Sequence, residues 1–223
     1  MKDAMQAPLF MTVVSQDASY RGMARDNRKR HEAYCDRHGY NYCLEYRSTE
    51  NLPWFRIEAL VEKLRNPDNS HVFMIDADSC VVDTDKDMRE ALPEWAWLGI
   101  TIHPFAWARR DWHLQAGTFY VRNTPESLAF FERVLALRGY NQGLKEWHDQ
   151  GAMNWLMLDE DPSRWQKGLH ILDYAWNNTV HWHSPDRVIL AAWHGHKDGA
   201  GRRTAMQDFW QDKDAGVTEG KEG

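Results

Sequence analysis

Residues 72–75 form an uninterrupted apolar run, Val-Phe-Met-Ile, that ends directly on Asp76. The turn-forming sequence Asn-Pro-Asp-Asn-Ser precedes this run at 66–70. A strand without a polar face has to be covered on both sides, as the central strand of a parallel sheet is when helices lie on either face. The run therefore predicts an α/β fold built on a mostly parallel sheet.

The chain before this run alternates between strand-like and helix-like patterns. Residues 9–15 and 41–46 have the apolar content of strands, whereas residues 54–64 carry their apolar side chains on one helical face. Residues 25–37 form a charged, helix-like segment that is followed by Gly39, a helix stop signal. The first 80 residues therefore predict the order strand, helix, strand, helix, strand.

The second half of the chain predicts further strands and helices with less regular spacing. Strands are expected at 98–103 and 118–121, helices at 125–137 and from about residue 146, and short strands between 171 and 193. The residues from Gln211 onward are almost entirely polar, which is typical of a disordered tail. We therefore expect one domain over residues 1–210 and a disordered tail over residues 211–223.

The composition limits the class of protein. With 223 residues, 43% of them hydrophobic, the chain is long enough to bury the core of one domain. Its formal net charge of -6 includes no long run of one sign, which disfavours a nucleic-acid-binding surface or a polybasic membrane patch. Residues 1–16 lack the long apolar core that is typical of a signal peptide, and no stretch approaches the roughly 18 apolar residues of a membrane span. We therefore expect a soluble, cytoplasmic protein with no transmembrane segment.

Asp76 and Asp78 follow the buried strand at the place where α/β proteins bind their ligands. Ligands of open α/β sheets bind beyond the carboxyl ends of the strands. The two aspartates are two positions apart, so in extended backbone both carboxylates point the same way. Such a pair can hold a divalent cation, which in turn holds phosphate oxygens. The same Asp-x-Asp spacing occurs at four other places, but only this pair follows a buried strand; the alternative is a strand-end turn with solvated acids.

Three downstream segments supply the other residue types that a metal-diphosphate site needs. The first contains a glycine, at which the backbone can approach a ligand closely. The second contains an acid beside an amide, and the third contains imidazoles and a lysine in a glycine-rich loop. The segments are LQAGTFYVRNT at 114–124, WHDQ at 147–150 and WHGHKDG at 193–199.

These motifs, in this order, resemble one family. The sequence is similar to nucleotide-sugar-dependent glycosyltransferases of the GT-A type, most of all to the group that contains fungal galactosyl- and mannosyltransferases and plant xyloglucan xylosyltransferases. The resemblance covers roughly residues 10–200 and implies a Rossmann-like, mixed and mostly parallel sheet flanked by helices. Its motifs are HGYNY, WFRIEAL, VFMIDADSCV, LQAGTFYVRNTPES, WHDQGAMN and WHGHKDG.

The resemblance implies a metal and diphosphate site. Asp76 and Asp78 match the family's Asp-x-Asp, which holds manganese against the diphosphate of a donor such as a UDP-sugar; magnesium is the alternative cation. His194 matches the late histidine that completes the metal shell, with His196 as the competing assignment. Lys197 would meet a phosphate. Next to His194, Gly195 would let the chain turn tightly around the diphosphate.

The resemblance also implies residues on the sugar side of the site. Gln115, Ala116 and Gly117 fall where the family has an Asn-x-Gly turn that lines the donor sugar, and the glutamine departs from that pattern. Asp149 and Gln150 match the acidic and amide pair on the reacting side of the sugar. Asp149 could orient the acceptor hydroxyl or stabilise the oxocarbenium-like carbon, or it could be an acid favoured by the helix dipole.

The function implied is transfer of a sugar from a nucleotide-diphosphate sugar to an acceptor hydroxyl. The acceptor could be a glycan, a lipid-linked sugar, a protein or a modified nucleobase. The family's eukaryotic members carry a membrane anchor that this sequence lacks, so the resemblance suggests a cytoplasmic enzyme of a bacterium or of a virus in its host.

Two other classes of protein stay open at the level of sequence. A magnesium-dependent phosphohydrolase also places Asp-x-Asp after an apolar strand, with the first aspartate as nucleophile. That motif normally opens its domain, however, whereas some 70 residues precede Asp76. A non-catalytic sugar-binding module would explain the two aspartates and the twelve tryptophans of the chain, but not the buried strand that leads to the aspartates. A calcium loop at Asp83, Asp85 and Asp87 is disfavoured because Met88 stands where the sharp-turn glycine is required.

Overall fold

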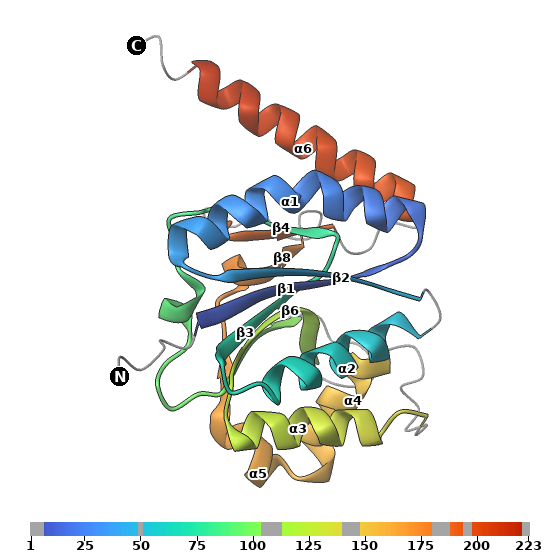
Figure 1. Ribbon diagram of the computed structural model, residues 1–223, viewed down its shortest axis with the longest axis vertical. Coiled ribbons are helices and arrows are strands. Elements are labelled where there is room, and N and C mark those ends of the chain that lie inside the picture. The colour runs from blue at the N-terminus through green and yellow to red at the C-terminus, as the bar shows by residue number, and fades with distance from the viewer. Residues whose placement is uncertain are drawn as a thin grey trace.

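The computed structural model describes residues 7–48, 51–103, 113–139, 148–179, 188–193 and 198–219. Its main sheet has six strands in the order β2-β1-β3-β6-β5-β7 (Figure 1). The strand pairs β1/β2, β1/β3 and β5/β7 are parallel, and β6 runs antiparallel to both of its neighbours. The predicted mixed, mostly parallel sheet is therefore confirmed. Its strands are β1 (Ala7–Ser15), β2 (Asn41–Arg47), β3 (Asn69–Ile75), β5 (Leu98–His103), β6 (His113–Arg122) and β7 (Leu169–Ile171).

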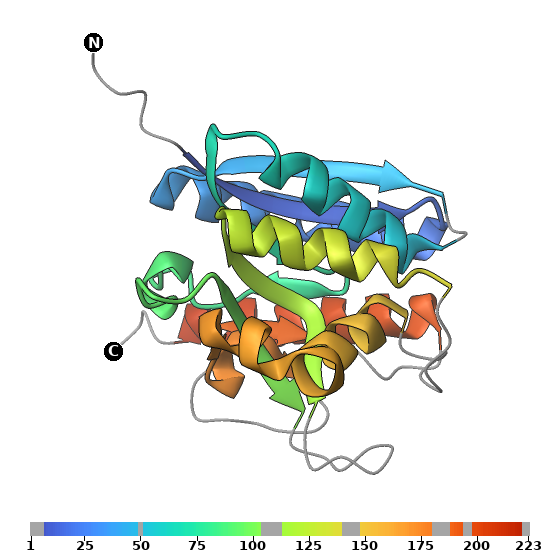
Figure 2. The ribbon, with the colours of Figure 1, turned by 90° about the horizontal axis from the view of Figure 1, so that it is seen from below.

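Helices cover both faces of this sheet. On one face lie α1, α6 and a small sheet with the strand order β4-β9-β8; on the other lie α2, α3, α4 and α5, and α2 and α3 run side by side (Figures 1 and 2). The longer helices are α1 (Ala18–His38), α2 (Leu52–Leu64), α3 (Pro125–Ala136), α4 (His148–Trp155) and α6 (Gly199–Glu219). The small sheet contains β4 (Ser79–Val81), β8 (Asn178–Thr179) and β9 (Leu190–Ala192). The short turns of helix are η1 (Met88–Ala91), η3 (Leu156–Glu160), α5 (Pro162–Trp165), η4 (Gln166–Gly168) and η5 (Tyr174–Asn177).

The apolar run of β3 is buried on both faces, as its sequence predicted. Val72 and Met74 belong to the core beneath α2, α3 and α4, whereas Phe73 and Ile75 belong to the core beneath α1. Alternate residues of a strand point to opposite faces, so one short run supplies both cores. These four side chains are no more than 1% exposed. The strand that carries Asp76 at its end is therefore held rigidly in the middle of the molecule.

Capping residues fix both ends of α1 and the start of α3. Asp17 accepts hydrogen bonds from the backbone N–H groups of Ser19 and Tyr20, so α1 begins seven residues before the expected charged segment at 25–37. Gly39 ends this helix with a left-handed φ of 71°. Thr124 and Ser127 form a reciprocal capping box at the start of α3.

Helix α6 includes most of the segment that was expected to be disordered. The sequence predicted a disordered tail over 211–223, but the structure continues α6 without interruption to Glu219. The first half of α6 is docked on α1: Arg203 pairs with Asp26 at 2.8 Å, and the guanidinium of Arg30 lies 3.8 Å from the centre of the Trp210 ring. Residues 199–219 contain no proline, so a helix anchored at one end can continue beyond its contacts. The domain boundary at residue 210 stays a prediction.

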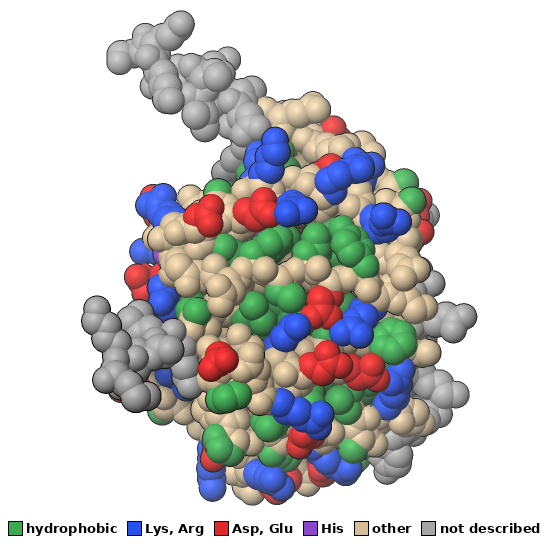
Figure 3. All heavy atoms as spheres, in the orientation of Figure 1, with side chains coloured by type: hydrophobic (Ala, Val, Ile, Leu, Met, Phe, Trp, Pro, Cys, Tyr) green, Lys and Arg blue, Asp and Glu red, His purple; other side chains and the backbone are tan. Residues whose placement is uncertain are grey.

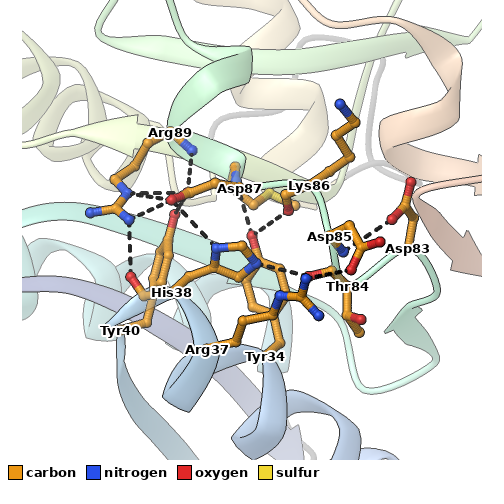
Figure 4. Close-up of polar contacts among 11 residues, drawn as sticks. Tyr34, Arg37, His38, Tyr40, Asp83, Thr84, Asp85, Lys86, Asp87 and Arg89 are labelled. Atoms are coloured by element: carbon orange, nitrogen blue, oxygen red, sulfur yellow. Dashed lines mark hydrogen bonds and ion pairs between the residues drawn. The ribbon is translucent and has the colours of Figure 1, made fainter.

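The segment after β4 is anchored to the end of α1 by buried polar contacts (Figure 4). The hydroxyl of Tyr34 donates to the carbonyl of Lys86 and accepts from the backbone N–H of Met88. The carboxylate of Asp87 accepts from Tyr40 and Arg89. Arg89 and Tyr40 lower the pKa of Asp87, although burial acts to raise it. Two of the acids with calcium-like spacing are thus engaged by the protein itself, because Asp85 also pairs with a guanidinium, that of Arg37.

None of the helices in the described part of the chain has both the length and the hydropathy of a membrane span.

Candidate active site

Asp76 and Asp78 lie in a tight turn at the carboxyl end of β3. The backbone N–H of Ser79 donates to the carbonyl of Asp76 at 3.1 Å, and the N–H of Asp76 donates to the carbonyl of Gly117 on β6 at 2.9 Å. The N–H of Trp193, which directly follows β9, donates to the carbonyl of Asp78 at 2.9 Å. The turn therefore joins the main sheet to the small sheet. The side chain of Asp76 is 30% exposed, whereas that of Asp78 is 3% exposed.

Arg56, on α2, links the first aspartate to Asp149. Its Nη1 donates to Asp76 at 2.5 Å, and its Nε donates to Asp149 at 2.7 Å. The third donor, Nη2, reaches the carbonyl of Ala116 at 2.7 Å. Burial acts to lower the pKa of Arg56, but the two carboxylates outweigh it and raise the pKa, so the guanidinium is charged. One buried guanidinium thus binds two carboxylates that are far apart in the sequence, those of Asp76 and Asp149.

The amide side chains of α4 complete the hydrogen bonding of β6. Oε1 of Gln150 accepts from the backbone N–H of Ala116 at 2.8 Å, and Oδ1 of Asn154 accepts from the N–H of Leu114 at 2.8 Å. Because an unpaired buried backbone N–H is costly, these contacts hold α4 firmly against the strand. They bring Asp149, at the first turn of α4, to the same sheet edge as Asp76.

The expected donor-lining residues lie on β6, beside the aspartates. Ala116 and Gly117 contribute backbone carbonyls, which bind Arg56 and Asp76 respectively. The side chain of Gln115 is buried, and its Oε1 accepts from the hydroxyl of Thr101 on β5 at 3.0 Å. Their contact with a donor sugar stays a prediction.

Arg202, in the first turn of α6, pairs with the second aspartate. Its Nη1 lies 2.7 Å from Asp78 and 3.1 Å from the hydroxyl of Tyr20. Burial raises the pKa of Tyr20, and the nearby carboxylates of Asp78 and Asp76 add to the effect while Arg202 opposes it. Each carboxylate of the Asp-x-Asp pair therefore has a guanidinium partner.

The late loop of the sequence motif lies outside the described residues. This applies to His194, Gly195, His196 and Lys197, so the assignment of a metal-ligand histidine stays a prediction. The described residues on either side, Trp193 and Arg202, both contact Asp78. Within the described ranges, no group of three or more histidine, cysteine, aspartate or glutamate side chains could hold a metal ion.

Arg56 and Arg202 were not among the predicted site residues. The signal for Arg56 was available: it precedes Leu60 by four positions, so it borders the apolar face of α2 that packs against the sheet. Arg202 had a weaker signal, a basic residue just after a glycine-rich motif. Their partners lie 20 and 124 positions away along the chain, and sequence periodicity does not report contacts of this range.

Comparison with solved structures identifies the fold. A glycosyltransferase involved in the glycosylation of the major capsid of the virus PBCV-1 aligns with a TM-score of 0.69 and 18% identity, over 90% of this chain and 99% of that one. Mouse xyloside xylosyltransferase 1 aligns with a TM-score of 0.53 and 10% identity, over 86% and 99% of the respective chains. The galactosyltransferase LgtC aligns with a TM-score of 0.55 and 12% identity, over 88% and 94%. The chain therefore has the GT-A glycosyltransferase fold.

No protein-family model matches this sequence, and no curated protein matches it.

Proposed function

We propose that this chain is a metal-dependent glycosyltransferase that moves a hexose or a pentose from a nucleotide-diphosphate sugar, a UDP-sugar in our proposal, to an acceptor hydroxyl. The observation that carries the proposal is the juxtaposition, on a GT-A fold, of the Asp76 and Asp78 turn with Asp149 through one buried arginine. This arrangement puts charged groups that can bind a cation and a diphosphate beside a separate carboxylate. Membership of the group with fungal and plant transferases is part of the proposal.

The carboxylate oxygens at the turn are suitable ligands for a divalent cation. Carboxylate oxygens are ligands that manganese and magnesium both accept, and an imidazole from His194 or His196 would favour manganese. Asp76 and Asp78 would hold the cation, which when bound supplies positive charge to stabilise the leaving diphosphate. The site already balances both carboxylates with positive charge, since Arg56 and Arg202 pair with them.

The side chains around the turn would then divide the work of donor binding. A cation on Asp78 competes with Arg202 for the same carboxylate, so we expect this guanidinium to turn to a phosphate oxygen of the donor. Lys197 would neutralise a further phosphate oxygen, and Gly195 would let the chain approach the diphosphate closely. These charges act on negative charge that grows as the anomeric bond breaks.

Asp149 and Gln150 would act on the sugar rather than on the metal. Arg56 fixes one carboxylate oxygen of Asp149, and the backbone of Ala116 fixes the amide oxygen of Gln150. A carboxylate held in this way can orient the acceptor hydroxyl or stabilise positive charge on the anomeric carbon. Gln115, Ala116 and Gly117 would line the donor sugar beside it.

A phosphohydrolase fits the topology less well. Its nucleophilic aspartate would have to be Asp76, which follows the third strand along the chain and lies after two complete strand-helix units. One oxygen of this carboxylate is also held by a buried arginine. The sugar-transfer proposal uses both features.

A thermal-shift screen tests the proposal without knowledge of the acceptor. A ligand that binds only the folded chain raises its melting temperature. We expect UDP or a UDP-sugar with manganese to stabilise the chain more than the nucleotide or the cation alone. If no nucleoside diphosphate or nucleotide-sugar stabilises it, with or without manganese, the proposal is wrong.

A further inference from the structure

Asn27 lies on α1, outside the residues discussed so far, yet its side chain holds the Asp-x-Asp turn. It is 1% exposed, and its Nδ2 donates to two backbone carbonyls, those of Ala77 at 3.3 Å and Ser79 at 3.1 Å. These are the carbonyls on either side of Asp78. One amide group therefore holds two peptide groups of the turn: the Ala77–Asp78 peptide directly before the second aspartate, and the Ser79–Cys80 peptide one residue beyond it.

Asn27 is the donor to two of the four carbonyls of this turn. The carbonyl of Asp76 accepts from the N–H of Ser79, and the carbonyl of Asp78 accepts from the N–H of Trp193. The carbonyls of Ala77 and Ser79 accept from Asn27. Four consecutive carbonyls thus have donors, and Asn27 supplies two of these bonds. Buried backbone groups that lose such partners are costly, so the turn depends on this side chain for its shape.

The other polar atom of the same amide makes an unfavourable contribution to stability. Oδ1 of Asn27 is buried and has no hydrogen-bond partner among the described residues. Burying a polar atom in this way typically costs about 1–3 kcal/mol. The two hydrogen bonds that Nδ2 donates have to offset this cost.

We infer that Asn27 is a positioning residue for the Asp-x-Asp pair, one that fixes the direction of the Asp78 carboxylate toward a cation and a nucleoside diphosphate. The inference rests on the proposed function, because it concerns the same site. Asp76 directly follows β3, so the strand sets its direction, whereas Asp78 lies inside the turn after the strand. Asn27 holds the chain on both sides of Asp78, through the carbonyl of Ala77 before it and the carbonyl of Ser79 after it, so the direction of its carboxylate depends on these contacts.

The chain contains a control residue that makes the same kind of contact at a less buried position. Nδ2 of Asn123 also donates to two carbonyls, those of Asn66 at 3.1 Å and Asn69 at 2.9 Å. This second clamp fixes the turn before β3, at the end of the strand opposite to Asp76. The two asparagines thus make the same kind of contact at the two ends of one strand, and only one of them is next to the proposed site.

The experiment compares Asn27→Leu with Asn123→Leu, and Asn27→Ala with Asn123→Ala in case the leucine variants fold poorly. For each purified protein we would measure the melting temperature, and the affinity for manganese by calorimetry with UDP present. We expect both asparagines to matter for stability. Manganese affinity should fall roughly tenfold or more in the Asn27 variants, as it does when groups that orient metal ligands are removed, and stay within about twofold in the Asn123 variants.

The outcomes separate the inference from the function on which it rests. Folded Asn27 variants that bind manganese and UDP as tightly as the unaltered chain would overturn the inference alone. So would equal losses of affinity in the Asn27 and Asn123 variants, because these would reflect stability. An unaltered chain that binds neither manganese nor UDP would overturn the proposed function and this inference together.

Discussion

At the scale of single residues, the site is dominated by two arginines with different surroundings. Arg56 is buried between two carboxylates and a carbonyl, whereas Arg202 is 23% exposed and reaches its carboxylate from the first turn of α6. The first is therefore part of the rigid frame. The second lies where a cation or a diphosphate would have to displace it. These positions lead to different expectations for their variants.

Replacing Arg56 should destabilise the chain strongly. Arg56→Met leaves Asp149 and Asp76 without their shared partner, and the loss of one member of a buried ion pair typically costs about 3–5 kcal/mol. Arg65, the residue that caps the end of α2, pairs with Glu132 in an exposed position, so Arg65→Met should cost less than about 1 kcal/mol. Urea denaturation of both variants checks this. Equal, small losses would show that Arg56 does not have the role assigned to it.

Replacing Arg202 should move two affinities in opposite directions. Arg202→Gln removes the cation that competes for Asp78, so manganese alone should bind more tightly. The same variant lacks a guanidinium for the phosphates, so UDP with manganese should bind more weakly. Arg203→Gln is the neighbouring control, because Arg203 pairs with Asp26 on α1. Changes of the same sign for both ligands, or the same pattern in the control, would contradict this exchange.

At the scale of elements, α1 has more than one function. Its N-terminal half supplies Tyr20 and Asn27 to the surroundings of the Asp-x-Asp turn, and its C-terminal half anchors the segment after β4. Between them His31 packs on Phe10 of β1, with ring centres 4.8 Å apart. The Nε2 of His31 is buried without a hydrogen-bond partner among the described residues. The helix thus contains a group that favours folding only when it is neutral.

His31 should make the stability depend on acidity. Burial lowers the pKa of this imidazole to about 3, whereas an unfolded histidine titrates near about 6.5. Between these values the unfolded chain binds the additional proton, so stability is lost as the pH falls below about 6.5. His31→Phe should flatten this loss by up to about 1.4 kcal/mol per pH unit.

Urea denaturation of the unaltered chain and of His31→Phe at several pH values between 4 and 7 measures this effect. His71, whose pKa burial lowers to about 4 with help from Arg122 and Arg89, keeps a residual slope in both proteins. Two curves that stay parallel over this range would show that His31 contributes nothing to the pH dependence.

At the scale of the whole molecule, the sequence predicted the frame better than the site. The apolar run at 72–75 has to be buried on both sides, so it indicated a central strand and placed Asp76 at its end. The contacts that hold the two aspartates and their turn come from Asn27, Arg56 and Arg202, which lie on three different helices. No local pattern reports which helices meet at one sheet edge. The helical state of residues 211–219 was missed for a related reason, because composition indicated disorder while docking on α1 starts the helix earlier.

The charged side chains on one face of the molecule are mixed in sign. Lysine and arginine side chains alternate with aspartate and glutamate over the face shown in Figure 3, and no large area of one sign covers it. Such a surface does not by itself select an acceptor.

In the proposed function, Asp76 and Asp78 hold a cation against the diphosphate of a sugar donor. The most direct measurement is the release of UDP from UDP-sugars by the unaltered chain, with and without manganese, beside Asp76→Asn and Asp78→Asn. We predict release that requires manganese and is lost in both variants, while their melting temperatures show that they remain folded. Full release without manganese, full activity in both variants, or phosphate release from a simple phosphoester in place of UDP release would contradict the account.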